Sequence, residues 1–443
     1  MLAYYLDLAW RSLRRHVVLT ALMILTLGFG VGASMTTLTV LHALSRDPIP
    51  GKSHKLFFVQ LDPRKLAGYV PGGEPEGQLT RLDAEALLRA GRADRQAMMV
   101  GGNVGVEPVR DPGAAALPAT YVDARWTSAD FFPMFDVPFA AGRGWTVVED
   151  EAAARVVVIT RELADKLFGT VDAVGKSVRV NDTAMRVVGV LDAWQPPSHF
   201  YDLSVGTFGV AEQVFAPFST SVALKLGRSG DVNCWAHSVT AAKDDDWVYA
   251  LDAPCAWILF WVELDRPERV AAYRDFLIDY SIEQHKAGRF ERPPTVALRD
   301  VLAWLDHKQV VPDEVHLQTA VALGFLAVCL INTVGLLLTK FLRRSPALGV
   351  RRALGASRRA IFVQLLVEAG MVGVAGGVLG LGLAWLGLLA VRHQPTDYAP
   401  LAHLDLPMLG ATIALAIASS LLAGVVPAWR GCQLPPAIQL KSQ

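Results

Sequence analysis

Few residue patterns in this chain could carry chemistry, and none has the spacing of a known catalytic site. The closest is Gly169-TVDAV-Gly175-Lys176-Ser177, a candidate nucleotide-binding loop. Such a loop needs four residues between its glycines, and it must open a helix whose N-terminus faces the phosphates. Here five residues separate the glycines and a strand-like sequence follows. We interpret the segment as a turn between a helix and a strand.

The sequence also lacks metal-binding and nucleophile motifs. It contains ten histidines and four cysteines but no HExxH, CxxC or GxSxG pattern. His285, His307 and His316 come closest to a group, and they lack ligand spacing. We therefore predict a non-enzymatic chain with no metal ion and no cofactor of its own.

Two polar residues, Asn332 and Glu368, lie inside long apolar runs. If the runs are membrane helices, each residue lies about 10–12 Å from the basic stretch 340–360 that separates them. Polar groups at such depth are costly, so we predict a hydrogen bond between Asn332 and Glu368 that holds two antiparallel helices together. The alternative is that Glu368 carries protons, but the runs contain no further acids to pass a proton along.

Cys234 and Cys255 are the two cysteines outside the apolar runs and their flanks. If their compartment is oxidising, a disulfide between them is expected. The alternative is a pair of free buried thiols. Cys329 and Cys432 lie in or beside apolar runs and suggest no metal site.

The elements around these residues include four long apolar runs, in a chain of 443 residues that is 52% hydrophobic. The runs are Val17–Leu41, Thr319–Leu338, Ile361–Val391 and Leu406–Val426. Each is long enough to cross a hydrocarbon core of ~30 Å as a helix. Four buried helices of a soluble protein would show polar residues at helical period, and these runs show almost none. The balance of 42 basic and 42 acidic residues gives no sign of a nucleic-acid partner.

The orientation follows from basic residues in the short flanks, because these favour the cytoplasmic side. The basic residues of the flanks are Arg11, Arg14, Arg15, the seven Lys and Arg of 340–360, Arg430 and Lys441. The connection 392–405 has one Arg and no Lys. We predict that both termini and the basic stretch are cytoplasmic, and that the segment after the first run forms a large domain on the other side.

The predicted fold is a four-helix membrane protein with an α+β domain of two subdomains inserted between the first and second membrane helices. The predicted order is an amphipathic elbow helix 1–16, membrane helix 17–44, external domain 45–318, membrane helix 319–340, cytoplasmic segment 341–360, membrane helix 361–391, loop 392–405, membrane helix 406–426 ended by Pro427, and tail 427–443. Within the external domain, 45–119 and 227–310 form one subdomain and 120–226 forms an inserted one. Glycines at helix-contact spacing predict close packing: Gly28, Gly32, Gly373, Gly376, Gly377 and Gly380.

Within the external domain, β-branched apolar segments bounded by turn residues predict strands, and amphipathic segments predict helices. The predicted strands are Lys55–Leu61, Arg155–Thr160, Met185–Leu191 and Ala256–Leu264. The predicted helices are Ala84–Ala90, Arg161–Phe168 and Pro267–Gln284. The segment Asp192–Gly230, rich in Pro, Gly, Ser and aromatic residues, is expected to consist of loops.

The chain resembles the MacB/FtsX superfamily of ABC transporter permeases over essentially its whole length. The matching residues are Leu348–Ser357 (LGVRRALGAS), Gln364, Glu368-Ala369, Pro427–Arg430 and Pro435–Leu440 near the C-terminus, and Phe131–Trp145, Val156–Gly169, Val174–Val180 and MRVVGV in the external domain. One membrane helix, a large external domain and three further membrane helices are also the order found in that family.

The resemblance implies a mechanotransmission permease of the bacterial inner membrane, with the large domain in the periplasm. An ABC ATPase would bind at the cytoplasmic face and carry the ATP and magnesium. Because only about 16 residues precede the first membrane helix, we expect that ATPase on a separate subunit. Export of drugs, peptides or other substrates is the favoured function, with lipoprotein handling or control of cell-wall hydrolases as alternatives. A membrane-anchored receptor or scaffold without an ATPase is the alternative from another class.

The expected ATPase contact is the short segment Ala347–Ala356. Its residues are Ala347, Leu348, Gly349, Val350, Arg351, Arg352, Leu354, Gly355 and Ala356, with Arg351 and Arg352 as the first candidates for contact. The family usually has Arg-Glu just before the Ile/Leu-Gly of this segment, whereas Pro346 and Ala347 stand here. This difference favours a heterodimer with a second, intact permease over a homodimer. The use of a periplasmic adaptor and an outer-membrane channel is left open.

Overall fold

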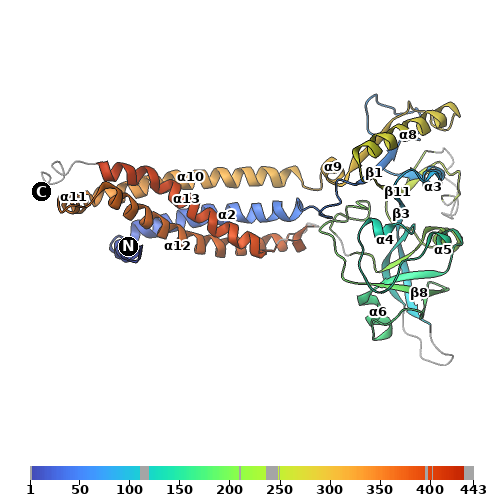
Figure 1. Ribbon diagram of the computed structural model, residues 1–443, viewed down its shortest axis with the longest axis horizontal. Helices are drawn as coiled ribbons and strands as arrows, with labels where there is room; N and C mark the ends of the chain where they lie inside the picture. The colour runs from blue at the N-terminus through green and yellow to red at the C-terminus, as the bar shows by residue number, and fades with distance from the viewer. Residues whose placement is uncertain are drawn as a thin grey trace. The chain divides into compact units, whose positions relative to one another are not determined.

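The computed structural model describes residues 2–109, 119–208, 211–235, 248, 250–394, 398–401 and 403–433. It divides into two compact units, Met1–Arg46 with Val311–Gln443, and Asp47–Val310. We call the first the helical unit and the second the external domain (Figure 1). The predicted motif Pro435–Leu440 and Lys441 lie outside the described residues.

The helical unit contains four helices that are long and apolar enough to cross a membrane, and they run side by side (Figure 1). They are α2 (Val17–Leu44), α10 (Asp313–Arg343), α12 (Arg358–Arg392) and α13 (Leu406–Gln433). Shorter elements accompany them: α1 (Leu2–Arg15), α11 (Ser345–Ala353) and the 3₁₀ turn η2 (Ala399–Leu401). The first membrane helix has the predicted bounds.

Three of the helices extend beyond their predicted bounds, α12 by no more than three residues at either end. Helix α10 begins at Asp313, so residues 313–318 belong to it rather than to the external domain. The prediction that Pro427 ends the last helix is wrong, because α13 continues to Gln433. Proline removes one backbone hydrogen bond, but packing by neighbouring helices compensates for this in membrane helices. Here Pro427 itself is buried, and Ala428 packs in the same apolar cluster as residues of helices α10 and α12.

In its described residues, the external domain combines twelve strands with helices of four to twenty residues. Its strands are β1 (Leu56–Leu61), β2 (Leu79–Thr80), β3 (Arg95–Pro108), β4 (Thr120–Thr127), β5 (Phe139–Gly142), β6 (Val156–Thr160), β7 (Ser177–Val180), β8 (Thr183–Leu191), β9 (Val214–Pro217), β10 (Asn233–Cys234), β11 (Cys255–Glu263) and β12 (Val296–Asp300). Its helices are α3 (Arg81–Ala90), α4 (Phe131–Met134), α5 (Val147–Glu151), α6 (Arg161–Phe168), α7 (Phe218–Ala223), α8 (Pro267–Lys286) and α9 (Val301–His307).

One mixed sheet runs through the external domain in the order β12-β1-β11-β3-β4-β9-β6-β8-β5. The first four of these strands come from the predicted outer subdomain, and the other five from the predicted insert 120–226. Strands β3 and β4 pair antiparallel at the border, from Val106–Thr120 to Met99–Thr127. The insert is thus one contiguous half of a shared sheet, and its independence as a subdomain stays a prediction.

Apolar side chains cover both faces of the sheet. In β1, Phe57, Val59 and Leu61 belong to one buried cluster. The alternating residues Leu56 and Phe58 belong to another. Because successive side chains of a strand point to opposite faces, continuous apolar sequence indicates a strand buried on both sides. This explains why β1, β6 and β11 were recognisable from the sequence.

The predicted strands and helices of the external domain occur within a few residues of their expected bounds. The expectation of loops alone for Asp192–Gly230 is wrong, because this segment contains β9 and α7. Strand β9 has only four residues and ends in Pro217, so no sequence period marks it. It forms because it pairs with β4 on one side and β6 on the other.

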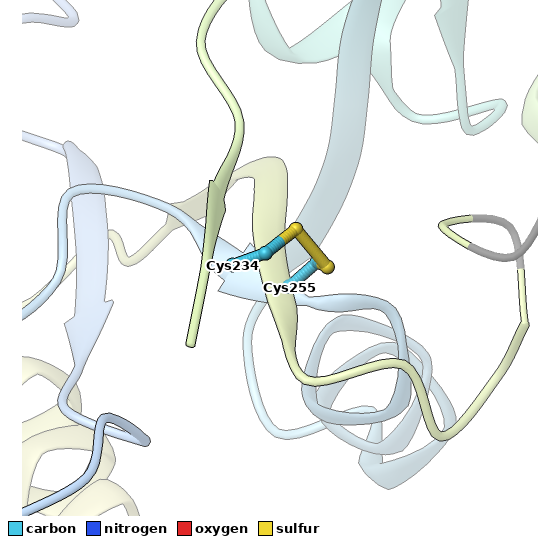
Figure 2. The surroundings of a disulfide bond; sticks show 2 residues. All are labelled: Cys234 and Cys255. Atoms are coloured by element: carbon cyan, nitrogen blue, oxygen red, sulfur yellow. A yellow bond between two sulfur atoms is a disulfide. The ribbon is translucent and has the colours of Figure 1, made fainter. Parts of the chain in front are cut away.

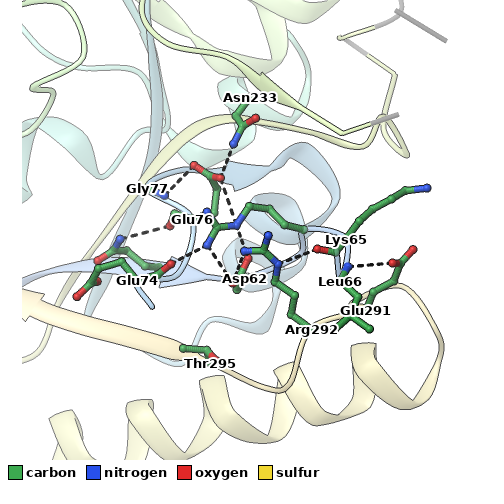
Figure 3. A network of polar contacts seen from close by, with 12 residues as sticks. Asp62, Lys65, Leu66, Glu74, Glu76, Gly77, Asn233, Glu291, Arg292 and Thr295 are labelled. Carbon is green, nitrogen blue, oxygen red and sulfur yellow. Dashed lines mark hydrogen bonds and ion pairs between the residues drawn. The ribbon is translucent and has the colours of Figure 1, made fainter. Parts of the chain in front are cut away.

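A polar network fixes the loop that follows β1 (Figure 3). Asp62 accepts hydrogen bonds from Arg64, at 2.6 Å, and from Arg292, at 3.2 Å. Glu76, later in the same loop, accepts a hydrogen bond of 2.6 Å from Asn233 of β10. These contacts connect the loop to Asn233 on β10 and to Arg292 just before β12. Both partners lie far from the loop in sequence.

The predicted disulfide between Cys234 and Cys255 is present in the structure (Figure 2). The two cysteines are directly opposite each other on the antiparallel pair β10 and β11. Cys329 and Cys432 are free and buried. The bridge therefore attaches a two-residue strand to the central strand β11.

We expect replacement of both Cys234 and Cys255 by serine to destabilise the external domain by about 3 kcal/mol, because the bridge restricts the unfolded chain. Denaturant unfolding of the full chain in detergent measures this loss. Dithiothreitol should destabilise the wild type similarly and should not affect the double variant. An unchanged wild-type transition under dithiothreitol would contradict the expectation.

Candidate functional site

The short helix α11 is defined by sequence signals at both of its ends. Pro346 lies in its first turn, where a missing N–H costs nothing. Gly355 follows the helix with a φ of 101°, a conformation that favours glycine. Ser357 then caps α12 by accepting a hydrogen bond of 3.1 Å from the Ala360 N–H. The residue at the N-cap position of α11 is Arg344.

The two arginines of α11 attach it to neighbouring elements. Arg351 donates to the side chain of Gln364 on α12, at 2.7 Å, and to the hydroxyl of Tyr4 on α1, at 2.9 Å. Arg352 donates to the carbonyl of Cys432 on α13, at 3.3 Å. Both arginines are half-buried and hold α11 in place, and their predicted contact with a partner stays a prediction.

Apolar packing against α10, α12 and α13 also holds α11 in place. Leu348 is buried in a cluster with Phe341 of α10, Ile361 and Leu365 of α12, and Cys432. Gly349 is also buried. Helix α11 is therefore packed against the ends of membrane-spanning helices, and a displacement of α11 would load those helices directly.

The outer face of α11 is apolar and open. Leu354 is 84% exposed and Val350 is 47% exposed. Gly355 is exposed and Ala356 is half-buried, while nothing is described of the Ala347 side chain. Arg358 and Arg359 lie exposed just beyond this face. Exposed large apolar side chains beside positive charges are typical of a surface that a protein partner covers.

A buried charge cluster lies at the same end of the helical unit. Glu368 of α12 forms ion pairs with Lys340, at 2.7 Å, and with Arg344, at 2.9 Å. Ser12 of α1 hydrogen-bonds to the same carboxylate and to Arg344. Lys340 also donates to Thr20 of α2, at 3.4 Å. The cluster thereby joins α1, α2, α10 and α12 in one polar network.

The predicted pair of Asn332 and Glu368 is wrong. Asn332 is exposed on α10, and no hydrogen bond joins it to Glu368 in the described part of the chain. A carboxylate in a buried site is stabilised far more by cations than by an amide, and Lys340 is completely buried beside it. From the sequence, we used Arg344 only to orient the membrane helices. Its positive charge lies at a depth similar to that of Glu368, and this was the available sign that the two residues form an ion pair.

Helices α2 and α12 approach each other closely through four of the predicted glycines. A methyl group on Gly32 would lie 2.8 Å from Cβ of Leu383, and one on Gly28 would lie 2.7 Å from the Leu379 side chain. From the opposite helix, Gly376 and Gly380 lie against α2, and Gly380 faces Val31.

The other two predicted glycines lie on a different face of α12. Gly373 is against Ser420 of α13, and a methyl group on Gly377 would lie 2.8 Å from Cβ of Ala416. Small residues allow such backbone approach in membrane helices. Helix α12 is therefore closely packed against both α2 and α13. Its N-terminal end, which we predict to be cytoplasmic, contains Glu368 and contacts α11.

Within the described residues, no group of three or more His, Cys, Asp or Glu side chains could hold a metal ion. The residues 169–177 form a turn between α6 and β7, as interpreted from the sequence.

Two family models match the chain. One, described as MacB-like periplasmic core domain, covers residues 20–275, and the other, described as FtsX-like permease C-terminal, covers residues 319–436.

Curated relatives match over nearly all of this chain. The macrolide export ATP-binding/permease protein MacB of Rhodospirillum rubrum is 26% identical, over 99% of this chain and 60% of that protein. The pyoverdine export ATP-binding/permease protein PvdT of Pseudomonas fluorescens is 25% identical, over 98% of this chain and 59% of that protein. The chain thus spans about three fifths of the length of these relatives.

Among solved structures, the periplasmic region of MacB from Actinobacillus actinomycetemcomitans is similar over 59% of this chain and 95% of that one. The sequence identity is 13% and the TM-score is 0.35. The extracellular domain of the ABC-type transporter YknZ from Gram-positive bacteria covers 55% of this chain and all of its own length, with 11% identity and a TM-score of 0.34.

Proposed function

Because this chain belongs to the family of MacB/FtsX-type ABC transporter permeases, we propose that it transmits the motion of an ABC ATPase to its periplasmic domain. It is a multi-pass membrane protein with an α+β periplasmic domain between α2 and α10. In the proposal, the α11 end of the helical unit faces the cytoplasm, and ATP and magnesium bind to an ATPase outside residues 1–443. Mechanical export of a substrate from the periplasm is the proposed outcome.

The observation that carries the proposal is that one side of α11 is packed against the membrane helices while the other side is exposed. Its buried side holds the helix to α1, α12 and α13 through Arg351, Arg352 and Leu348. Its outer side presents Val350 and Leu354. We propose that the outer side binds the ATPase, and that α10 and α12 move with α11. Because α2 and α10 continue along the chain into the periplasmic domain, their displacement would act on that domain.

The partners follow the same proposal. A second permease completes the transporter, and a heterodimer is favoured because Pro346 and Ala347 replace the charged pair usual in the family. Lipoprotein handling and regulation of cell-wall hydrolases remain alternative outputs of the same motion. If the chain were a receptor or scaffold without an ATPase, the exposed Leu354 would have no assigned role.

We expect Leu354→Glu to reduce recovery of the ABC ATPase with this chain about tenfold, because a charge at the contact centre costs on the order of 1.4 kcal/mol or more. The measurement is co-purification from a membrane expressing both proteins, followed by ATP turnover. Val70→Glu is the matched control, since Val70 is 66% exposed in the periplasmic domain. Undiminished recovery and turnover with Leu354→Glu would contradict the assignment of this surface, and recovery of no ATPase with the wild type would favour the scaffold.

A further inference from the structure

A groove of about 660 Å³ lies in the periplasmic domain where the two halves of the sheet meet. Helix α3 forms one wall, and α5 with α7 forms the other. Gln96 and Met98 of β3 contribute the floor, together with Ser128 after β4. The groove therefore lies within one copy of the chain, between segments that are distant in sequence.

Both walls are held by capped helices. Thr80 caps α3 by accepting a hydrogen bond of 3.2 Å from the Asp83 N–H. Thr146 and Glu149 form a capping box at the start of α5. Arg143 donates to Glu149, at 2.9 Å, and this hydrogen bond lowers the pKa of Glu149 to about 2. Such local order indicates a groove that exists before a ligand arrives.

The middle of the groove is apolar. Leu88, Met98, Phe218 and Val222 line it. Val147, at the edge, is 58% exposed. An apolar ligand surface placed here would be removed from water together with these side chains, which favours binding.

Gln96, which lines the groove, has an unpaired acceptor atom. Its side chain is only 6% exposed, and its Nε2 donates to the carbonyl of Leu88, at 3.0 Å. Its Oε1 is buried and has no hydrogen-bond partner among the described residues. A buried acceptor left unpaired is destabilising, and a ligand N–H or O–H that reached it would remove that cost.

The α3 wall has its charges paired internally. Glu85 forms ion pairs with Arg81, at 2.7 Å, and with Arg89, at 3.4 Å. These side chains lie on one helix at i,i+4 spacing. Two guanidinium groups share this one carboxylate, so the α3 wall keeps one net positive charge, against three carboxylates on the opposite wall.

The opposite wall is acidic. Asp130, Asp150 and Glu151 line it, and none of them forms an ion pair within the described ranges. Asp150 accepts hydrogen bonds from Ser219, at 3.1 Å, and from the Ala129 N–H, at 3.2 Å. Burial nevertheless raises the pKa of Asp150 to about 6, because no cation faces it closely enough to offset the desolvation of the carboxylate.

We propose that this groove binds a small amphipathic molecule carrying a positive charge. The apolar part of the molecule lies on Met98, Phe218 and Val222. Its cation faces Asp150 and Glu151, and a neighbouring N–H or O–H group donates to Gln96 Oε1. The charge and shape of the groove select the ligand, and binding needs neither ATP nor an ATPase.

The test uses the full chain in lipid nanodiscs without ATP, with rhodamine 6G as the cationic amphipathic probe and fluorescein as its anionic counterpart. Fluorescence polarisation gives the Kd. We expect Asp150→Asn combined with Glu151→Gln to weaken rhodamine 6G binding about tenfold, because a desolvated charge contact is lost. The control, Glu162→Gln combined with Asp165→Asn on the exposed side of α6, removes the same charge elsewhere.

A second variant tests the position without removing an acid. Ala223 is exposed and lines the groove, so Ala223→Arg should fill the site and supply its cation, which abolishes measurable binding. The proposal is overturned if rhodamine 6G binds both groove variants as tightly as the control, or if fluorescein binds the wild type equally well. Since no ATPase is present, these outcomes are independent of the Leu354→Glu result.

Discussion

Replacement of Glu368 by glutamine is expected to destabilise the helical unit by about 3–5 kcal/mol, the usual cost of leaving a buried charge without its partner. Lys340 is completely buried 2.7 Å from the Glu368 carboxylate. Arg344 is partly exposed and can turn toward water, whereas Lys340 cannot do so without moving α10. The measurement is unfolding of the full chain in mixed micelles at increasing denaturant.

Two further variants separate charge pairing from other effects. Glu314→Gln, at the exposed start of α10, makes the same change without a buried partner and should be neutral. Lys340→Met combined with Glu368→Leu should recover most of the stability, because an apolar pair of similar volume replaces the ion pair. Wild-type stability in Glu368→Gln, together with loss of transport, would instead support the proton-carrier alternative.

The second large effect is expected from Gly32→Val. Even a single methyl group at this position would lie 2.8 Å from Cβ of Leu383 and 3.1 Å from the carbonyl of Gly380. Helices α2 and α12 must therefore separate, and overpacking of this kind costs about 1–3 kcal/mol. Gly382→Val is the matched control, because no atom lies within 4 Å of a methyl group at that glycine.

The readout combines thermal stability in detergent with ATP turnover in the presence of the ATPase. Gly32→Val should lower the melting temperature and uncouple turnover, since a displaced α12 carries α11 with it. If Gly32→Val and Gly382→Val behave alike, the α2–α12 contact is not the close packing that we infer.

The membrane helices could be predicted from the sequence because their determinant is local. An uninterrupted apolar run long enough to span a bilayer leaves few alternatives. The α2 bounds were predicted correctly, and the bounds of α12 to within three residues. The packing glycines were found for a similar reason, since small residues at short spacing along one helix mark close helix contact, although the structure divides those of α12 between two faces. Helix α13 was predicted too short because Pro427 is a stop signal only where tertiary packing does not override it.

The strands β1, β6, β8 and β11 were equally visible, because burial on both sides requires continuous apolar sequence. Strand β9 was not visible, because its stability comes from partners on β4 and β6. The disulfide was predicted from compartment and count, and the structure added that the two cysteines pair across β10 and β11.

The sequence by itself determined the order of the membrane helices and the inserted domain, the membrane character and the family, while the coupling role of Ala347–Ala356 stays a prediction. Only the tertiary structure decided which side chains of the helical unit form ion pairs, which hold α11 in place and which stay exposed. Glu368 pairs with Lys340 and Arg344 rather than Asn332, because only folding shows which charges are buried together. Arg351 and Arg352 hold α11 in place, which leaves the exposed Leu354 as the proposed contact. Periodicity depends on neighbours along one helix, whereas ion pairs and grooves depend on distances between helices and strands that no local pattern encodes.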